Sequence, residues 1–155
     1  MDNLVNCFST TVMKHPDKKA IALRDDAVTF EQLAQVARRY AAAIKNALPE
    51  NSTNQPVGVF TNRDVNPVKW FMGALYSHNF YVPVDPEMPD EKMKLLFEDA
   101  GFQVVLCGED NKAKLAAIGY EGAVITTDTI GDDEYEDNSA QPQDPAYMIY
   151  TSGST

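Results

Sequence analysis

A run of small hydroxyl residues around one glycine closes the sequence: Thr151, Ser152, Gly153, Ser154 and Thr155. Their four hydroxyl groups and the backbone N–H groups can donate hydrogen bonds to phosphate oxygens. Gly153 lets the backbone approach a ligand closely, because glycine has no Cβ and adopts φ values that other residues avoid. A flexible linker can have the same composition. Composition alone therefore leaves two readings open, a polyphosphate-binding loop and a linker.

Other residue types that commonly do chemistry form no recognisable site. The eight glycines fit neither G-x-G-x-x-G nor G-x-x-x-x-G-K-[ST]. Cys7 and Cys107 lie far apart without C-x-x-C spacing, which predicts buried small hydrophobic residues and no zinc site. His15 and His78 have no evident nucleophile or carboxylate partner, so His78 is predicted to complete a turn or to meet a helix dipole. We predict no catalytic residue and no metal ligand.

Acidic residues crowd into residues 128–143, where no periodicity survives. A calcium-binding loop is one interpretation and a solvated surface loop is the other. An EF-hand requires ligands at alternate positions, a glycine at the sixth and a glutamate at the twelfth, which this stretch lacks. The sequence therefore predicts an acidic surface loop.

Charge and composition limit the classes of partner. The 155 residues are 44% hydrophobic and 23% charged, as in an ordinary globular domain. The formal net charge of −10 disfavours nucleic acid and anionic membranes, although ATP can still bind locally with its own magnesium. No apolar run reaches the roughly 18 residues of a membrane span, and residues 1–7 lack the pattern of a signal peptide. We therefore expect a cytoplasmic protein without nucleic acid or membrane partners.

The elements needed to position the terminal loop can be read from hydrophobic periodicity. Residues 147–150 are apolar and predict a strand that leads directly into the hydroxyl run. Upstream, short β-rich runs alternate with amphipathic helices, which indicates a mostly parallel sheet covered by helices. Expected helices are 4–13, 30–48, one from 66, 90–100 and 112–118; expected strands are 57–60, 80–84, 103–106 and 123–126, with a hairpin over 20–23 and 28–30.

Local signals mark several helix ends. Thr29 and Gln32 have the form of a capping box at the start of the second helix. Asn66 is predicted to cap the third helix, with Pro67 at its first position, where the missing N–H is not needed. Gly101 and Gly119 follow the last periodic residues of two later helices and predict their ends. Trp70 and Phe71 are predicted to lie in the core.

Three segments, in the right order, resemble core motifs of the adenylate-forming superfamily, which comprises acyl-CoA synthetases, luciferases and nonribosomal peptide synthetase adenylation domains. Residues 144–155, DPAYMIYTSGST, closely resemble its phosphate-binding motif. Residues 28–33, VTFEQL, and 74–86 resemble the first and second core motifs. The run that begins YVPVDPEMPDEK is similar to amino-acid-activating members, including D-alanine ligases that load a carrier protein. The resemblance covers residues 8–155.

Two departures from the family pattern stand out. Residues 76–80, YSHNF, occupy the place where the family usually has a small turn of the lysine-alanine-glycine type. Phe30 replaces a commoner tyrosine of the first motif. The departures suggest a divergent branch and leave the phosphate-binding motif intact.

The resemblance implies an α/β fold, a mostly parallel sheet flanked by helices, as the N-terminal portion of the large domain. Residues 1–155 would be a partial subdomain that stops within the phosphate-binding loop. The parent enzyme would use ATP and Mg²⁺ to join an amino acid or similar carboxylic acid to AMP. It would then transfer the acyl group to the phosphopantetheine thiol of a carrier protein. Thr151, Ser152, Gly153, Ser154 and Thr155 would hold the β- and γ-phosphates.

The same resemblance places the adenine, ribose, magnesium and carboxylate sites and the catalytic lysine beyond Thr155. We therefore expect residues 1–155 alone to be inactive, with residues 152–155 mobile. Two other interpretations stay open: a free-standing nucleotide- or phosphate-binding module of flavodoxin-like shape, and a structural or interaction domain. The sequence assigns no particular acid and does not distinguish a free-standing ligase from one domain of a larger synthetase.

Overall fold

Helices and strands alternate through the computed structural model, which describes residues 3–151. The elements are α1 (Leu4–Lys14), β1 (Lys19–Leu23), β2 (Asp26–Thr29), α2 (Phe30–Ala47), β3 (Pro56–Phe60), α3 (Asn66–Tyr76), β4 (Phe80–Val84), α4 (Asp90–Ala100), β5 (Val104–Leu106), the 3-10 turn η1 (Glu109–Asn111), α5 (Lys112–Ala117) and β6 (Ala123–Ile125). Each predicted helix is present, with bounds that differ by a residue or so from those expected.

Four parallel strands form the central sheet, in the order β4-β3-β5-β6. β3 pairs with β4 from Pro56 opposite Phe80 to Phe60 opposite Val84, and β5 lies on the other side of β3. After β3 the chain adds β4 on one side, then returns to add β5 and β6 on the other side. Such a reversal is a topological switch point, and open α/β sheets bind ligands there, beyond the carboxyl ends of the strands. The predicted parallel sheet flanked by helices is confirmed.

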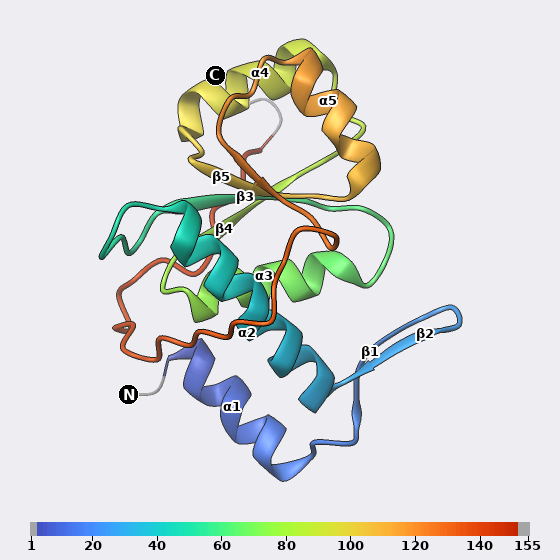
Figure 1. Ribbon diagram of the computed structural model, residues 1–155, viewed down its shortest axis with the longest axis vertical. Coiled ribbons are helices and arrows are strands. Elements are labelled where there is room, and N and C mark those ends of the chain that lie inside the picture. Colours follow the sequence, from blue (N-terminus) through green and yellow to red (C-terminus); the bar gives the residue numbers. More distant parts are fainter. Residues whose placement is uncertain (1–2, 152–155) are drawn as a thin grey trace.

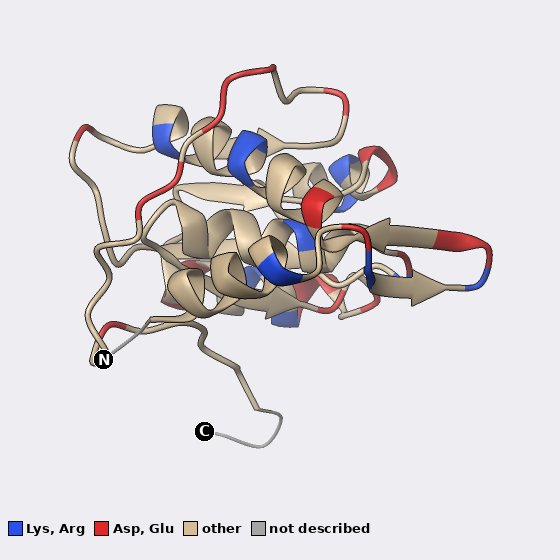
Figure 2. Ribbon diagram, turned by 90° about the horizontal axis from the view of Figure 1, so that it is seen from below, with Lys and Arg blue, Asp and Glu red and all other residues tan. Residues whose placement is uncertain are grey.

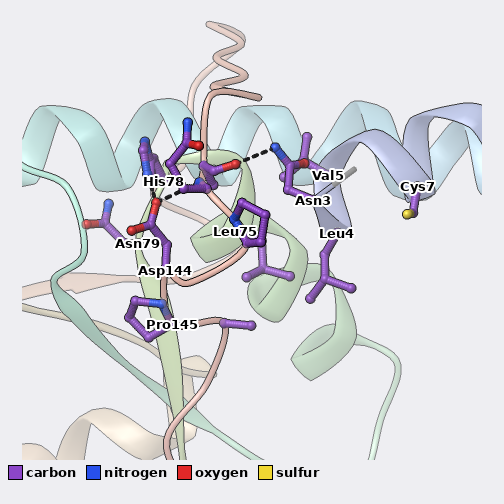
Figure 3. Close-up of a pocket in the computed structure, with 13 residues that line it drawn as sticks. Asn3, Leu4, Val5, Cys7, Leu75, His78, Asn79, Asp144 and Pro145 are labelled. Carbon is purple, nitrogen blue, oxygen red and sulfur yellow. Dashed lines mark hydrogen bonds and ion pairs between the residues drawn. The ribbon is translucent and has the colours of Figure 1, made fainter. Parts of the chain in front are cut away.

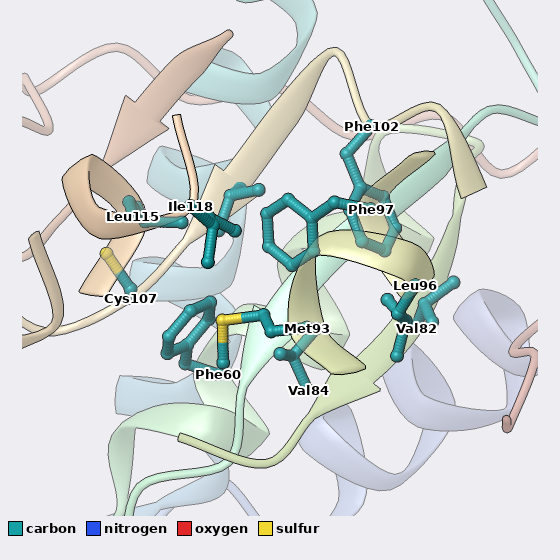
Figure 4. Packing of buried hydrophobic residues seen from close by; sticks show 11 residues of the cluster. Phe60, Val82, Val84, Met93, Leu96, Phe97, Phe102, Cys107, Leu115 and Ile118 are labelled. Atoms are coloured by element: carbon teal, nitrogen blue, oxygen red, sulfur yellow. The ribbon is translucent and has the colours of Figure 1, made fainter. Parts of the chain in front are cut away.

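Helices cover both faces of the sheet (Figure 1): α4 and α5 lie on one face, and α2 and α3 lie on the other. Figure 4 shows the first of these layers, where aromatic and aliphatic side chains of the strands meet those of α4 and α5. The second layer buries Trp70 completely against Tyr40 and the strands, as predicted. Because both faces are apolar, the strands are continuous hydrophobic runs and do not alternate with polar residues.

The start of α2 follows the predicted capping box. The Thr29 hydroxyl accepts a hydrogen bond from the Gln32 backbone N–H at 3.1 Å, and the Gln32 side-chain oxygen accepts one from the Thr29 N–H at 3.0 Å. Two backbone donors at the helix start are satisfied in this way. The interaction spans three residues, which is why the sequence alone revealed it.

The start of α3 differs from the prediction. Asn66 lies inside the helix, the N-cap residue is Val65, and no side chain caps the helix from that position. Instead, the Asp64 carboxylate accepts a hydrogen bond from the Asn66 N–H at 2.7 Å. The capping oxygen therefore comes from two residues earlier, because Asx side chains also bond to the backbone two positions ahead.

Residues outside the sheet form a small helical and hairpin extension. β1 and β2 pair antiparallel and project beside the amino-terminal end of α2 (Figure 1), with Arg24 in a left-handed conformation at the tip, φ 56°. α1 packs below α2 and α3 through buried Val5. Cys7, on the same helix, is exposed, whereas Cys107 is buried. The prediction of burial was therefore wrong for Cys7, because only one side of this short helix contacts the core.

Candidate functional site

Residues 144–150, which we name the lead-in segment, lie along the free edge of β4. The Tyr81 N–H donates to the Ala146 carbonyl at 3.2 Å, and the Met148 N–H donates to the Tyr81 carbonyl at 3.0 Å. These two hydrogen bonds make one parallel bridge, between Tyr147 and Tyr81. The predicted strand over 147–150 is therefore wrong in extent. Tyr147 and Ile149 are 56% and 60% exposed, so little burial on this edge supports a longer ladder.

Parallel pairing fixes the direction in which the lead-in segment runs. β4 ends at Val84, so a chain parallel to it carries Thr151 toward the carboxyl edge of the sheet. Thr151 is exposed. Ser152, Gly153, Ser154 and Thr155 lie outside the described residues, so their phosphate contacts and their mobility stay predictions.

Two tyrosine side chains, Tyr147 and Tyr150, hold the lead-in segment against the rest of the fold. The Tyr147 ring stacks on Tyr81 at 5.8 Å between centroids, and Tyr81 stacks on Phe71 of α3 at 4.2 Å. Further along, the Tyr150 hydroxyl donates to the Asp99 carboxylate of α4 at 2.5 Å. Burial and the adjacent carboxylate raise the pKa of Tyr150 to about 12. The segment thus contacts β4 through Tyr147 and α4 through Tyr150 just before the hydroxyl run.

A polar cleft of about 610 Å³ opens at the carboxyl ends of β3, β4 and β5. The Asn62 side-chain amide and the Gly108 N–H both donate to the Asn111 side-chain oxygen at 2.8 Å. A Cβ at Gly108 would lie 2.9 Å from the Asn62 amide nitrogen, so that side chain would have to shift to admit one. Sequence reasoning missed the cleft. The sequence feature that could have indicated the cleft is the polar residue that directly follows each buried strand, as at Thr61 and Asp85.

Carboxylates dominate this cleft. Lys112 pairs with Glu109 at 2.8 Å, and the buried Thr126 hydroxyl donates to the same carboxylate at 2.5 Å. Hydrogen bonds from Lys112 and then Thr126 lower the pKa of Glu109. Within the described residues, no three His, Cys, Asp or Glu side chains gather closely enough to hold a metal ion. An acidic wall repels bare polyphosphate, so such a ligand would enter only with its cation.

The acidic residues 128–143, which we name the strap, run across α2 from β6 to the lead-in segment. Arg38 pairs with Glu134 at 2.9 Å, and the Arg39 guanidinium donates to the Gly131 carbonyl at 2.7 Å. The Tyr135 N–H adds a backbone hydrogen bond to the Arg38 carbonyl at 3.0 Å. Figure 2 shows the acidic stretches of this connection beside the helices. The predicted surface loop is irregular and mostly exposed, but it is also fixed to α2, which the sequence did not indicate.

His78 joins the strap to the lead-in segment. Its Nδ1 lies 3.2 Å from Asp137 Oδ2 and its Nε2 lies 3.0 Å from Asp144 Oδ2. The His78 backbone N–H donates to the Leu75 carbonyl at 3.0 Å, and this hydrogen bond completes the turn after α3 as predicted. The carboxylate partners were missed, because they lie 59 and 66 positions away in the sequence.

The two carboxyl groups beside His78 have shifted pKa values. Burial alone would raise the pKa of Asp137, but hydrogen bonds from Ser139 and His78 outweigh burial and lower it. The Gln141 backbone N–H, followed by His78, lowers the pKa of Asp144. Both groups are therefore anionic at neutral pH. The arrangement joins one imidazole to two carboxylates, and the Ser139 hydroxyl also lies 3.4 Å from His78 Nδ1.

A cavity of about 290 Å³ lies beside this triad, between the start of α1, the α3–β4 turn and residues 140–146. Figure 3 shows His78 and Asp144 facing one another on its wall, with Leu4 and Leu75 nearby. The Asn3 side chain donates to the Ala140 carbonyl at 2.9 Å and closes one side. Several polar groups on this wall bond to one another, and the cavity lies at the boundary of the strap.

A family model described as "AMP-binding enzyme" matches residues 8–155, nearly the whole chain. This chain belongs to the AMP-binding enzyme family. The family's adenylate-forming members are the relatives that the three sequence motifs predicted. The fold, with its parallel sheet and flanking helices, is consistent with that membership.

Two curated relatives are named as synthases. Bacitracin synthase 1 of Bacillus licheniformis is 29% identical over 153 residues, which cover 96% of this chain and 3% of that protein. Indigoidine synthase of Dickeya dadantii (strain 3937) is 29% identical over 152 residues, which cover 92% of this chain and 10% of that protein. The chain therefore spans a small part of the length of these relatives.

Solved structures of family members superpose well on this chain. The fatty acyl-adenylate ligase of L. pneumophila, in complex with acyl adenylate and pyrophosphate, gives a TM-score of 0.84 at 23% identity, over 98% of this chain and 28% of that one. The AMPPNP-bound form of the nonribosomal peptide synthetase FmoA3 gives 0.80 at 26% identity, over 96% and 16%. Within residues 3–151, no helix combines the length and apolar character that crossing a membrane requires.

Proposed function

We propose that this chain is the N-terminal portion of the large domain of an ATP-dependent adenylate-forming ligase. The whole enzyme would join an amino acid or similar carboxylic acid to AMP and release pyrophosphate. It would then transfer the acyl group to the phosphopantetheine thiol of a carrier protein. Residues 1–155 would form a partial subdomain that stops within the phosphate-binding loop, and the acidic loop 128–143 would lie on its surface.

One observation carries the proposal. The parallel bridge between Tyr147 and Tyr81 directs the chain at Thr151 toward the carboxyl edge of the sheet. The family match over residues 8–155 includes this segment. Open α/β sheets bind their ligands at that edge. A hydroxyl-rich loop that starts there has the right donors for polyphosphate, because hydroxyl and backbone N–H groups both donate to phosphate oxygens.

The chemical difficulty of adenylation is charge, because a carboxylate must attack an anionic α-phosphate. We assign Thr151, Ser152, Gly153, Ser154 and Thr155 to hold the β- and γ-phosphates, which orients the α-phosphate and supports the leaving pyrophosphate. Mg²⁺ supplied with ATP neutralises phosphate charge when bound.

The relatives support the substrate class. FmoA3, which is named as a nonribosomal peptide synthetase, has been solved with α-methyl-L-serine-AMP. An amino acid and a carrier protein are therefore the partners that we propose for the parent. A cytoplasmic location stays a prediction.

ATP–pyrophosphate exchange tests the function. The parent protein that contains this chain should exchange labelled pyrophosphate into ATP with one or a few amino acids and not with fatty acids. A parent variant with Gly153→Val should lose most of this exchange, since the branched side chain obstructs the backbone approach to phosphate. Exchange with no carboxylic acid, or full exchange by the variant, would contradict the proposal.

The chain by itself should not catalyse exchange, since it covers at most 28% of the solved relatives reported above. Catalysis by residues 1–155 would contradict that expectation. Calorimetric titration of the chain with Mg-ATP separates the alternatives. Clear affinity without catalysis would favour a free-standing nucleotide-binding module. No heat, no effect of nucleotide on melting and capture of one defined protein partner would favour an interaction domain.

A further inference from the structure

His78 occupies a backbone conformation that favours glycine. Its φ is 62°, in the left-handed region, where residues with a Cβ are uncommon. Left-handed non-glycine residues cost about 1 kcal/mol or more and persist where surrounding contacts enforce them. The histidine side chain must therefore contribute something that glycine would not.

The contacts of the imidazole show what it contributes. Among the described residues, the charged groups that contact the ring are the carboxylates of Asp137 and Asp144, and the Ser139 hydroxyl lies 3.4 Å from Nδ1. Carboxylates only accept hydrogen bonds, so both ring nitrogens must donate to complete this arrangement. Only the imidazolium form has two N–H donors. The His78 side chain is 13% exposed, so solvent screens these contacts incompletely.

The two carboxylates belong to different parts of the chain that must be placed together. Asp137 lies in the strap, and its N–H donates to the Tyr76 carbonyl at the end of α3 at 2.7 Å. Asp144 begins the lead-in segment and also accepts from the Asn54 side chain at 3.1 Å. Tyr147, which bridges to β4, follows three residues after Asp144. His78 is thus the point where the α3–β4 turn, the strap and the lead-in segment meet.

We propose that His78 is a positioning residue that, in its charged form, clamps Asp137 and Asp144 and thereby fixes the lead-in segment against β4. The clamp is closed when the imidazole is protonated and both carboxylates are ionised. It loosens as the pH rises and the imidazole loses one donor. The consequence for ATP, a phosphate loop displaced from the sheet edge, rests on the proposed function.

Amide hydrogen exchange of the chain tests the clamp without any assumption about activity. The reporter is the Met148 N–H, whose acceptor is the Tyr81 carbonyl. His78→Gly removes the imidazole contacts with both Asp137 and Asp144. Loss of the charge-assisted hydrogen bond to Asp144, which begins the lead-in segment, should by itself reduce the Met148 protection factor about tenfold. In the wild type, protection should be lower at high pH than at low pH, because a neutral imidazole has one N–H donor, and in the variant it should be independent of pH.

Two further variants keep the result interpretable. Arg24→Gly is the matched control, because Arg24 is also left-handed, at φ 56°, and lies at the tip of the distant hairpin. It should leave Met148 protection unchanged. Asp144→Asn should loosen the segment as His78→Gly does, and the double variant should be no looser than either single one. If His78→Gly does not fold, His78→Asn removes the charge with a residue that tolerates φ above zero.

Equal Met148 protection in wild type and His78→Gly at every pH would overturn the clamp. In the parent, ATP–pyrophosphate exchange by His78→Gly should show a KM for ATP raised about tenfold at about pH 6, with a smaller rise at higher pH. An unchanged KM would also count against the positioning role. A wild-type parent without any exchange would contradict the proposed function alone, and the amide measurement would still decide the clamp.

Discussion

Replacing Gly73 with alanine should destabilise the chain, although alanine is the better helix former. Gly73 lies where α3 crosses α2, and a Cβ there would be 2.7 Å from Tyr40 Cβ and 3.4 Å from the Ala37 carbonyl oxygen. Ordinary contacts begin at 3.4 Å, so the helices would have to separate by about 0.7 Å, which is 3.4 minus 2.7. Tyr40 cannot yield easily, because it is 1% exposed and its ring packs edge-on against Trp70.

The two opposing effects can be compared. Gly→Ala in a helix interior gains about 1 kcal/mol of helix propensity. Overpacking of a tight core contact costs about 1–3 kcal/mol, and the upper part of that range applies because the obstacle is the Cβ of buried Tyr40, which moves only with the backbone. The expected net loss is about 1–2 kcal/mol, which lowers Tm by about 2–8 °C for a chain of this size. Thermal melting and urea denaturation both measure it.

Gly131→Ala provides the control, since a Cβ there would meet nothing within 4 Å and the residue has no positive φ. Its Tm should stay within about 2 °C of the wild type, as expected for a surface substitution. If Gly73→Ala melted at or above the wild-type Tm, the two helices could not be in the close contact described, and the placement of α3 and of the turn that carries His78 would need revision.

Three other predictions concern ionisable groups. The folded pKa of Asp144 lies below its ordinary value, so its contribution to stability is present above about pH 4 and is lost as the pH falls through the folded pKa. At neutral pH, Asp144→Asn should therefore unfold at a lower urea concentration than the wild type. This difference should shrink at about pH 3. Tyr150→Phe should remove one phenol that ionises near pH 12 in an ultraviolet titration, and loss of a phenol that ionises near pH 10 instead would contradict the contact with Asp99. Burial raises the pKa of Cys107 to about 12, so a thiol reagent at about pH 8 should label Cys7 only, and Cys7→Ser should abolish labelling of the folded chain.

The sequence by itself determined the parts of this protein that depend on neighbours along the chain. The capping box of Thr29 and Gln32 spans three residues, and the apolar strands around Val57 and Val82 are continuous because a parallel sheet buries both faces. These local patterns predicted the order of helices and strands. The motif resemblance then predicted the family, since three spaced segments matched in order.

Tertiary structure decided which distant residues meet. The strap looks like an unattached acidic loop in the sequence, yet α2 supplies the arginines that fix it. His78 has no sequence neighbour that predicts a partner, because its carboxylates come from segments that only the completed sheet and helices bring to the same turn. Likewise, residues 147–150 carry a strand pattern, but they lie at an edge with one neighbouring strand, and a single bridge to Tyr81 forms. Pairing and charge contacts depend on what lies across space, and a periodicity along the chain does not contain that information.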